Sequence, residues 1–311
     1  SANETKKALD ALAKSALAPT FNDIRNTTEG VIAVMSQFGI RAKDMGKVLG
    51  SLNAVAGSFA VEAEDLISVI RRTGGVFKAA SGDIGSPIKQ LNELVAVFTS
   101  VRATTRESAE SIATGLRTIF TRIQRPSTLK FLNQLGVNLQ DLEGKFVGPY
   151  KAMQLLNEAL KSLDPRDVRF AKIVEQLGGF RQVGKLIPAI REFRKAEAAF
   201  AEAQKGATEG MGKDVELGLK PLSKQFDQLG QKWDKFIRKV TEGHTFQSLA
   251  RMAISTAEAF IKLGEAIEPI LPLITLMATT KLSKGLVGFA GGFMGSTKGL
   301  GAGMGVGSGL G

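Results

Sequence analysis

Apolar residues recur every three or four positions along most of this chain, which is the period of an amphipathic helix. The segment 44–60, "DMGKVLGSLNAVAGSFA", shows the pattern clearly. Its apolar positions are Met45, Val48, Leu49, Leu52, Val55, Ala56 and Phe59. Gly46, Gly50 and Gly57 lie inside the same segment, and each costs a helix about 1 kcal/mol relative to Ala. Glycines at such positions indicate close approach by another backbone.

Capping and breaking residues divide the pattern into short helices. Ser86 followed by Pro87 predicts one helix start, and the sequence also indicates starts at Thr105 and at Asp164. The pairs Gly74–Gly75 and Gly178–Gly179 predict helix ends. Because Arg71 and Arg72 precede the first pair, they are expected to stabilise the end of a helix dipole.

The glycine pairs also mark a weak internal repeat, "VIRRTGGVFK" (69–78) and "IVEQLGGFRQ" (173–182). We interpret it as two helical hairpins that share a type of connection. The loop "GVNLQDLEGKFVGPY" contains three glycines and a proline, and it has room for a small β-turn.

No segment has the pattern of a parallel sheet, so the predicted fold is all-α: stacked amphipathic helical hairpins, then long helices, then a Gly-rich apolar tail. The sequence predicts four segments: N-terminal helices at 1–39, a core helical domain at 40–190, long amphipathic helices at 191–268, and an apolar Gly-rich segment or linker at 269–311. The helices of 191–268 carry narrow apolar stripes, which favour a neighbouring helix from the same chain or from another copy.

Composition adds a charge bias and removes several kinds of chemistry. Lys and Arg outnumber Asp and Glu by 41 to 30, for a net charge of +11. This bias favours an anionic partner such as nucleic acid, lipid head groups or an acidic protein wall, although solubility explains it equally well. Cysteine is absent, which excludes disulfides and thiol chemistry. The chain begins at Ser1 and not at Met, so we expect a processed product or part of a longer protein.

Catalytic motifs are missing from the sequence. The one histidine, His244, lies in a predicted turn, and no metalloprotease, hydrolase or phosphate-loop spacing occurs. The acidic group Glu62, Glu64 and Asp65 falls in the first turn of a predicted helix, where it supports the dipole. We therefore expect no enzyme activity, no cofactor and no metal site.

A basic cluster is the main candidate for partner contact. It consists of Arg106, Arg117, Arg122, Arg125 and Lys130. Guanidinium groups there could hold phosphates or a carboxylate-lined wall, whereas the simpler reading is a solvated basic face. Trp233 and Phe236 lie on one helical face and could anchor a partner helix, with core packing as the alternative.

The apolar tail has two interpretations. Its stretch 270–280 is about half the ~20 residues that a membrane-crossing helix needs. Further apolar residues follow after two lysines: Leu286, Val287, Phe289, Phe293 and Met294. Glycine spacing there permits tight helix packing of the kind found in membranes, and in water it makes a flexible linker.

The chain resembles the core region of phage tail tape measure proteins of the TP901 type over about residues 40–190. Three stretches carry the resemblance: "SQFGIRAKDMGKVLGSLNAVAGSFAVEAEDLISVIRRTGGVFK", "SAESIATGLRTIFTRIQRPSTLKFLNQLGVNLQDLEGKF" and "KIVEQLGGFRQVGKLIPAI". It implies a virion structural protein inside the tail tube and tail tip, acting in tail length determination, tail assembly and genome ejection. The implied partners are other copies of the chain, tail tube and baseplate hub or distal tail proteins, the host membrane and genomic DNA.

The Gly and Pro breaks favour an anchoring end packed into the tail tip over an extended measuring rod. Two other classes remain open. One is a membrane-active, pore-forming or toxin-like helical protein that uses 266–311, and the other is a helical scaffold unrelated to tails.

Overall fold

The protein is all-α, as predicted. The computed structural model describes residues 2–161, 163–164 and 166–221, and in these ranges it contains no strand. The α-helices are α1 (Ala2–Ser15), α2 (Ile24–Phe38), α3 (Met45–Ser58), α4 (Ala63–Ser81), α5 (Pro87–Thr105), α6 (Ala109–Ile123), α7 (Pro126–Gln134), α8 (Pro149–Leu160), α9 (Val168–Leu177), α10 (Val183–Arg191) and α11 (Phe193–Glu209). Short 3₁₀ turns occupy Ala42–Asp44 and Phe180–Gln182. The predicted β-turn is present, closed by one isolated bridge between Gln140 and Phe146.

Two of the predicted helix starts are wrong by three residues. Helix α5 extends through Thr105, so the cap of α6 is Ser108, whose side chain accepts the N–H of Ser111. Helix α9 likewise begins after Asp167, because Asp164 instead forms a turn by accepting the N–H of Arg166. The start at Ser86 is confirmed, with its side chain accepting the N–H of Lys89.

Gly74 and Gly75 do not end a helix, contrary to the sequence prediction. Helix α4 runs through both of them to Ser81. Continuing the helix buries Phe77, whose ring meets that of Phe120 edge-on at 5.1 Å between centroids. Burying an aromatic side chain stabilises the fold by about 2 kcal/mol or more, which exceeds the helical cost of a glycine. The proposed repeat therefore fails, since only the second glycine pair ends a helix.

Helix α5 lies at the centre of the fold. From Gln90 to Val101 every residue except Glu93 is buried, so the helix is surrounded by neighbours on all sides. It packs against α4, α10 and α11, and α4 in turn packs against α2 and α6. A helix without a polar face needs such a central position, because any other would expose apolar surface.

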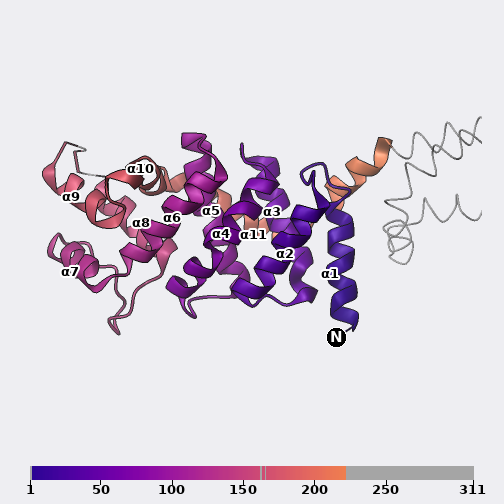
Figure 1. Ribbon diagram of the computed structural model, residues 1–311, viewed down its shortest axis with the longest axis horizontal. Coiled ribbons are helices and arrows are strands. Elements are labelled where there is room, and N and C mark those ends of the chain that lie inside the picture. The colour runs from indigo at the N-terminus through magenta and orange to yellow at the C-terminus, as the bar shows by residue number, and fades with distance from the viewer. Residues whose placement is uncertain (1, 162, 165, 222–311) are drawn as a thin grey trace, which may run out of the picture. The chain divides into compact units, whose positions relative to one another are not determined.

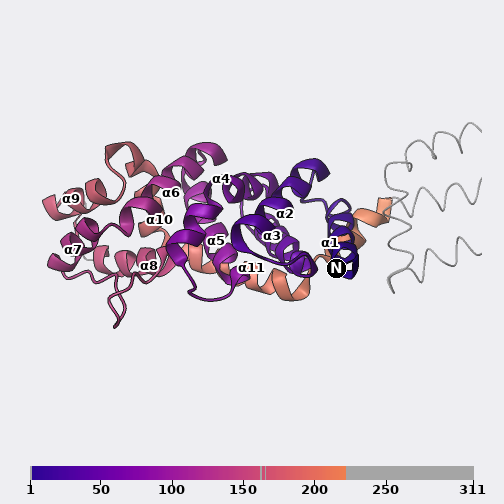
Figure 2. The ribbon, with the colours of Figure 1, turned by 60° about the horizontal axis from the view of Figure 1, so that its bottom comes forward.

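Helix α11 returns along the molecule, packing against α5 and then α3 (Figures 1 and 2). At its crossing with α3, a Cβ added to Gly206 or to Gly50 would overlap the carbonyl oxygen of the other glycine. The expected close approach therefore occurs at Gly50, whereas Gly46 and Gly57 have nothing within 4 Å. Ser1–Leu222 form one compact unit, and the division of the chain at 39/40 and 190/191 stays a prediction.

Among the described residues, no helix combines the length and the hydropathy that crossing a membrane requires. The predicted contact residues Trp233 and Phe236 lie outside the described residues, as does His244. The apolar tail residues Leu286, Val287, Phe289, Phe293 and Met294 lie outside them too.

Candidate functional site

Two members of the predicted basic cluster hold the fold together. Arg106 follows α5 in the left-handed conformation, with φ +60°, and its Nη1 donates to the carbonyl oxygen of Ala60 at 3.1 Å. Arg122 extends from α6 to the end of α9, where its Nη1 lies 3.4 Å from the carbonyl oxygen of Glu175. A cation at that position also stabilises the negative end of the α9 dipole.

The other three members are exposed, as Arg106 is, but their side chains make no such contact within the described chain. Arg117 lies on the outer face of α6, Arg125 directly precedes α7, and Lys130 lies on α7. Within the part of the chain that the structure describes, none of the three side chains has a hydrogen bond or an ion pair. Their charges are therefore available to a partner.

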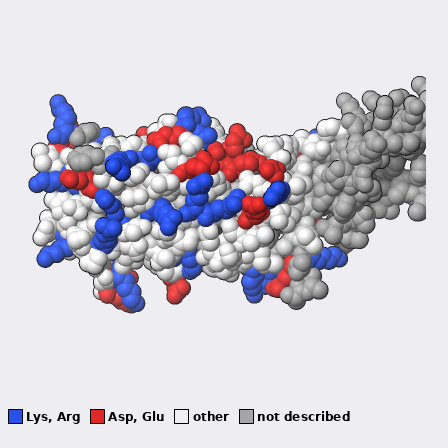
Figure 3. Space-filling model, in the orientation of Figure 1, with Lys and Arg blue, Asp and Glu red and all other residues white. Residues whose placement is uncertain are grey.

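The basic surface is wider than the sequence indicated. Arg25 on α2 and the adjacent Arg71 and Arg72 on α4 are also exposed, and α4 packs between α2 and α6. Figure 3 shows Lys and Arg side chains in a row across these three helices. We call this surface the basic row. Its residues are Arg25, Arg71, Arg72 and Arg117.

Arg71 and Arg72 were missed because a helix end was predicted after them, whereas α4 continues for nine residues more. They are therefore not dipole-stabilising residues at a C-terminus. Arg71 Nη2 lies 2.9 Å from Glu29 on α2, and Arg25 approaches the same carboxylate at 3.8 Å. One acid thus links two of the arginines in the row, and the periodicity of α4 beyond Gly75 was the signal that would have revealed them.

The predicted acidic group lies at the start of α4, as expected for dipole support. It also makes contacts between elements. The carboxylate of Asp65 accepts from Arg102 on α5 at 2.8 Å, and Glu64 accepts the backbone N–H of Asn22 at 2.9 Å. These carboxylates fix neighbouring helices, which leaves no sign of paired acid-base chemistry.

Two acids at the start of α6 are held in their charged form. The pKa of Glu107 is lowered, mainly by the hydrogen bond from Lys185 on α10, whose Nζ lies 2.8 Å away. The pKa of Glu110 is also lowered, chiefly by a bond from its own backbone N–H and then by one from Ser68. Figure 3 shows a patch of Asp and Glu bordering the row of Lys and Arg, with further acidic side chains within the row, so charges of both signs lie on this face.

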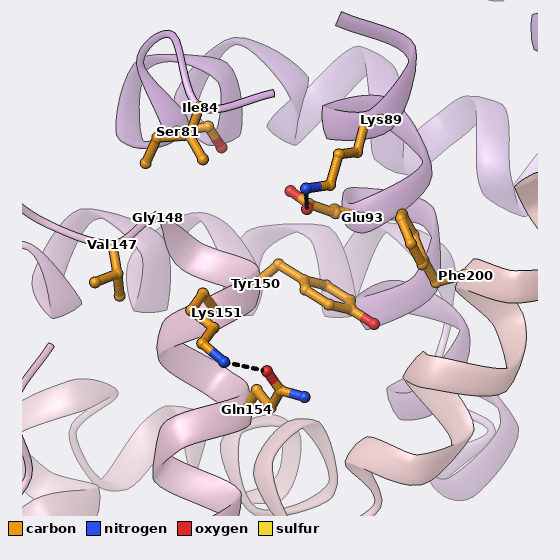
Figure 4. A pocket seen from close by; sticks show the side chains of 10 residues that line it. All are labelled: Ser81, Ile84, Lys89, Glu93, Val147, Gly148, Tyr150, Lys151, Gln154 and Phe200. Atoms are coloured by element: carbon orange, nitrogen blue, oxygen red, sulfur yellow. Dashed lines mark hydrogen bonds and ion pairs between the residues drawn. The ribbon is translucent and has the colours of Figure 1, made fainter. Parts of the chain in front are cut away.

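A cleft of about 320 Å³ lies beside α5, and the sequence gave no indication of it. Its walls come from the end of α4, the first turns of α5 and α8, and the middle of α11 (Figure 4). The lining residues are Ser81, Ile84, Lys89, Glu93, Val147, Gly148, Tyr150, Lys151, Gln154 and Phe200. Apolar side chains form much of the wall, and two lysines lie among them.

Three polar side chains of this cleft are wholly or partly buried. Glu93 is 12% exposed, and its burial raises its pKa to about 7, although Lys89 at 3.7 Å opposes the shift. Burial likewise raises the pKa of Tyr150, whose ring lies 5.4 Å from that of Phe200 between centroids. Ser81 is 2% exposed, and its hydroxyl has no hydrogen-bond partner. In the described residues no three potential metal-ligating side chains of His, Cys, Asp or Glu gather.

A model of the family described as phage-related minor tail protein matches residues 1–179. The chain belongs to this family. The matched range extends from α1 to the end of α9, so it includes the basic row and most of the cleft. No solved structure matches the chain.

As a phage minor tail protein, the chain is a structural component of the virion tail. The family is generally non-enzymatic. The resemblance over 40–190 falls largely within the matched range.

Proposed function

We propose that this minor tail protein is a tape measure protein whose residues 2–221 form an anchor at the tail tip and baseplate hub. In this role several copies contribute to tail assembly, tail length determination and genome ejection. The observation that carries the proposal is the return of α11 along α5 and α3, which folds the family's matched region into a compact unit.

Dimensions support anchoring over measuring. As one continuous helix, residues 2–221 would extend for about 330 Å, at 1.5 Å per residue. The longest helices described, α4 and α5, have 19 residues each and are therefore about 28 Å long. A unit folded in this way does not convert residue number into distance, whereas it offers a fixed surface for attachment.

The basic row supports an anionic partner inside the tail, such as an acidic tube or hub surface or the DNA that follows. Arg72 and Arg117 project from adjacent helices, and the whole chain carries a charge of +11. Guanidinium groups bind both carboxylates and phosphates through paired hydrogen bonds. Salt screens such charge–charge contacts, with a screening length of about 8–10 Å at about 0.1–0.15 M ionic strength. Binding should therefore weaken as the salt concentration increases.

Tail length in the parent phage tests the anchoring role. An insertion of 14 helix-forming residues in the link between α8 and α9 would lengthen a measuring rod by about 21 Å. An anchor should instead give tails of unchanged length in negative-stain micrographs. Tails longer by about 20 Å would contradict the anchoring role.

Charge reversal tests the basic row. The double substitution Arg72→Glu and Arg117→Glu should weaken binding of the purified chain to duplex DNA or to polyglutamate at 50 mM salt. The unsubstituted chain should itself lose this binding when the salt is raised to 300 mM. The matched control is Lys6→Glu, an exposed basic residue on α1 away from the row. Equal binding by the double variant and the control would remove the basic row from the proposal.

A further inference from the structure

The loop between α7 and α8 carries a fully exposed leucine at its tip. Leu142 lies in the turn closed by the bridge between Gln140 and Phe146, and its side chain contacts no other part of the described chain. Figures 1 and 2 both show this loop reaching away from the helices. We call residues 140–146 the tongue.

Hydrogen bonds hold the tongue in one conformation. Asp141 Oδ1 accepts the backbone N–H groups of Glu143 and Lys145, each at 2.9 Å. The side chain of Gln140 donates to the carbonyl oxygen of Gly144 at 2.6 Å. A partner that binds Leu142 would therefore not have to order the loop, which lowers the entropic cost of association.

The cleft complements the tongue in polarity and in net charge, since Lys89 and Lys151 outnumber Glu93 in the cleft, whereas Asp141 and Glu143 outnumber Lys145 in the tongue. The tongue presents one apolar side chain between Asp141 and Glu143, whereas the cleft has an apolar wall that includes Ile84 and Phe200. The cleft also contributes Lys89, which lies 3.7 Å from Glu93, and Lys151, which donates to Gln154 at 2.8 Å, and both are partly or fully exposed.

We propose that the cleft of one copy receives Leu142 from the tongue of a second copy, with the tongue acids against Lys89 and Lys151. The tongue of the same copy is directed away from the helices, and its last residue is followed immediately by Val147 in the cleft wall. Each copy therefore carries a donor and a receptor side by side. The contact is small, so it is of the weak, transient class that depends on high local concentration.

This inference rests on the proposed function only in that several copies meet in one tail. Its test uses the purified full chain, so a negative result would leave the anchoring role standing. Conversely, changed tail lengths in the phage experiment would not affect the contact between copies.

Disulfide trapping tests the contact, because the chain has no cysteine of its own. A Leu142→Cys protein is mixed with a differently tagged Ile84→Cys protein under mild oxidation, so that a mixed disulfide forms only between copies. The control partner is Ile32→Cys, an exposed apolar position on α2 that is not in the cleft wall. We expect the 142–84 product to exceed the 142–32 product several-fold.

Charge swapping separates a specific contact from random collision. Adding Lys151→Glu to the Ile84→Cys protein should lower the yield about threefold, as for a partly exposed ion pair. Adding Glu143→Lys to the Leu142→Cys protein should then restore it. If the Ile84 variant misfolds by circular dichroism, Phe200→Cys in the opposite wall replaces it. A yield equal to that of the Ile32 control, or unaffected by both charge changes, would overturn the proposal.

Discussion

The two halves of α11 pack in opposite ways. Near its start, Phe193 and Phe200 surround the ring of Tyr150, with centroids 4.9 and 5.4 Å away, and the cleft remains beside them. Near its end, Gly206 meets Gly50 so closely that neither has room for a Cβ. Large rings hold the helices apart and leave space between them, whereas glycines allow backbones to touch. One helix thus takes part both in a tight backbone crossing and in the wall of an open cleft.

The half of α11 that crosses α3 should be the more sensitive of the two to a substitution that adds volume. Gly206→Ala places a methyl group against the carbonyl oxygen of Gly50, and since both atoms belong to backbones, relief requires the helices to move apart. Overpacking of this kind costs about 3 kcal/mol of unfolding free energy. Urea denaturation followed by circular dichroism measures the loss.

Gly57→Ala is the matched control, because it changes a glycine of α3 that has nothing within 4 Å. It should raise the unfolding free energy by up to about 1 kcal/mol through improved helix propensity. Equal effects of the two substitutions would show that the crossing is not tightly packed.

At the cleft beside the other half of α11, the stability of the protein should depend on pH. Glu93 has a folded-state pKa of about 7 against an ordinary 4.5, so the folded protein binds more protons than the unfolded chain between these values. Stability should therefore fall as pH rises from about 5 to 7, by about 2 kcal/mol in total.

Glu93→Gln removes the titrating group and should flatten this part of the pH profile. It should also stabilise the protein at pH 8, where wild-type Glu93 is charged and buried. Urea denaturation at four pH values between 5 and 8 measures both effects. A wild-type profile as flat as that of the variant would mean that Glu93 is solvated like an ordinary surface acid.

The smallest expected effects concern the contact between α4 and α2. They test whether, there too, adding a Cβ destabilises the protein only at a glycine that touches a neighbouring helix. Gly74→Ala would place a Cβ 2.8 Å from the ring of Phe38, whereas Gly75→Ala has open space. The first should lower the unfolding free energy by about 1–2 kcal/mol, and the second should raise it by about 0.5–1 kcal/mol. Opposite shifts in the urea midpoint would confirm the rule, and shifts of the same sign would contradict it.

Local chemistry was sufficient to predict most helices but not all of their limits. Ser86 and Pro87 fix the start of α5 because capping and ring geometry act within a few residues. The two glycine pairs show where this reasoning fails. Gly179 has φ +68° and ψ 170°, a conformation that favours glycine, and there the chain turns. Gly74–Gly75 remain helical because α2 and α6 cover that part of α4.

The sequence by itself determined that the chain is all-α, basic and without catalytic motifs, because periodicity, charge and residue type are properties of the chain before it folds. Within its basic cluster, Arg106 and Arg122 each donate to a backbone carbonyl of another segment, whereas Arg117, Arg125 and Lys130 are exposed and make no such bond to the described residues. Only the tertiary structure decided that α11 returns to α3, that Arg72 lies beside α6, and that Tyr150 and Phe200 leave a cleft. These features depend on contacts between residues far apart in the chain, for which local sequence carries no signal.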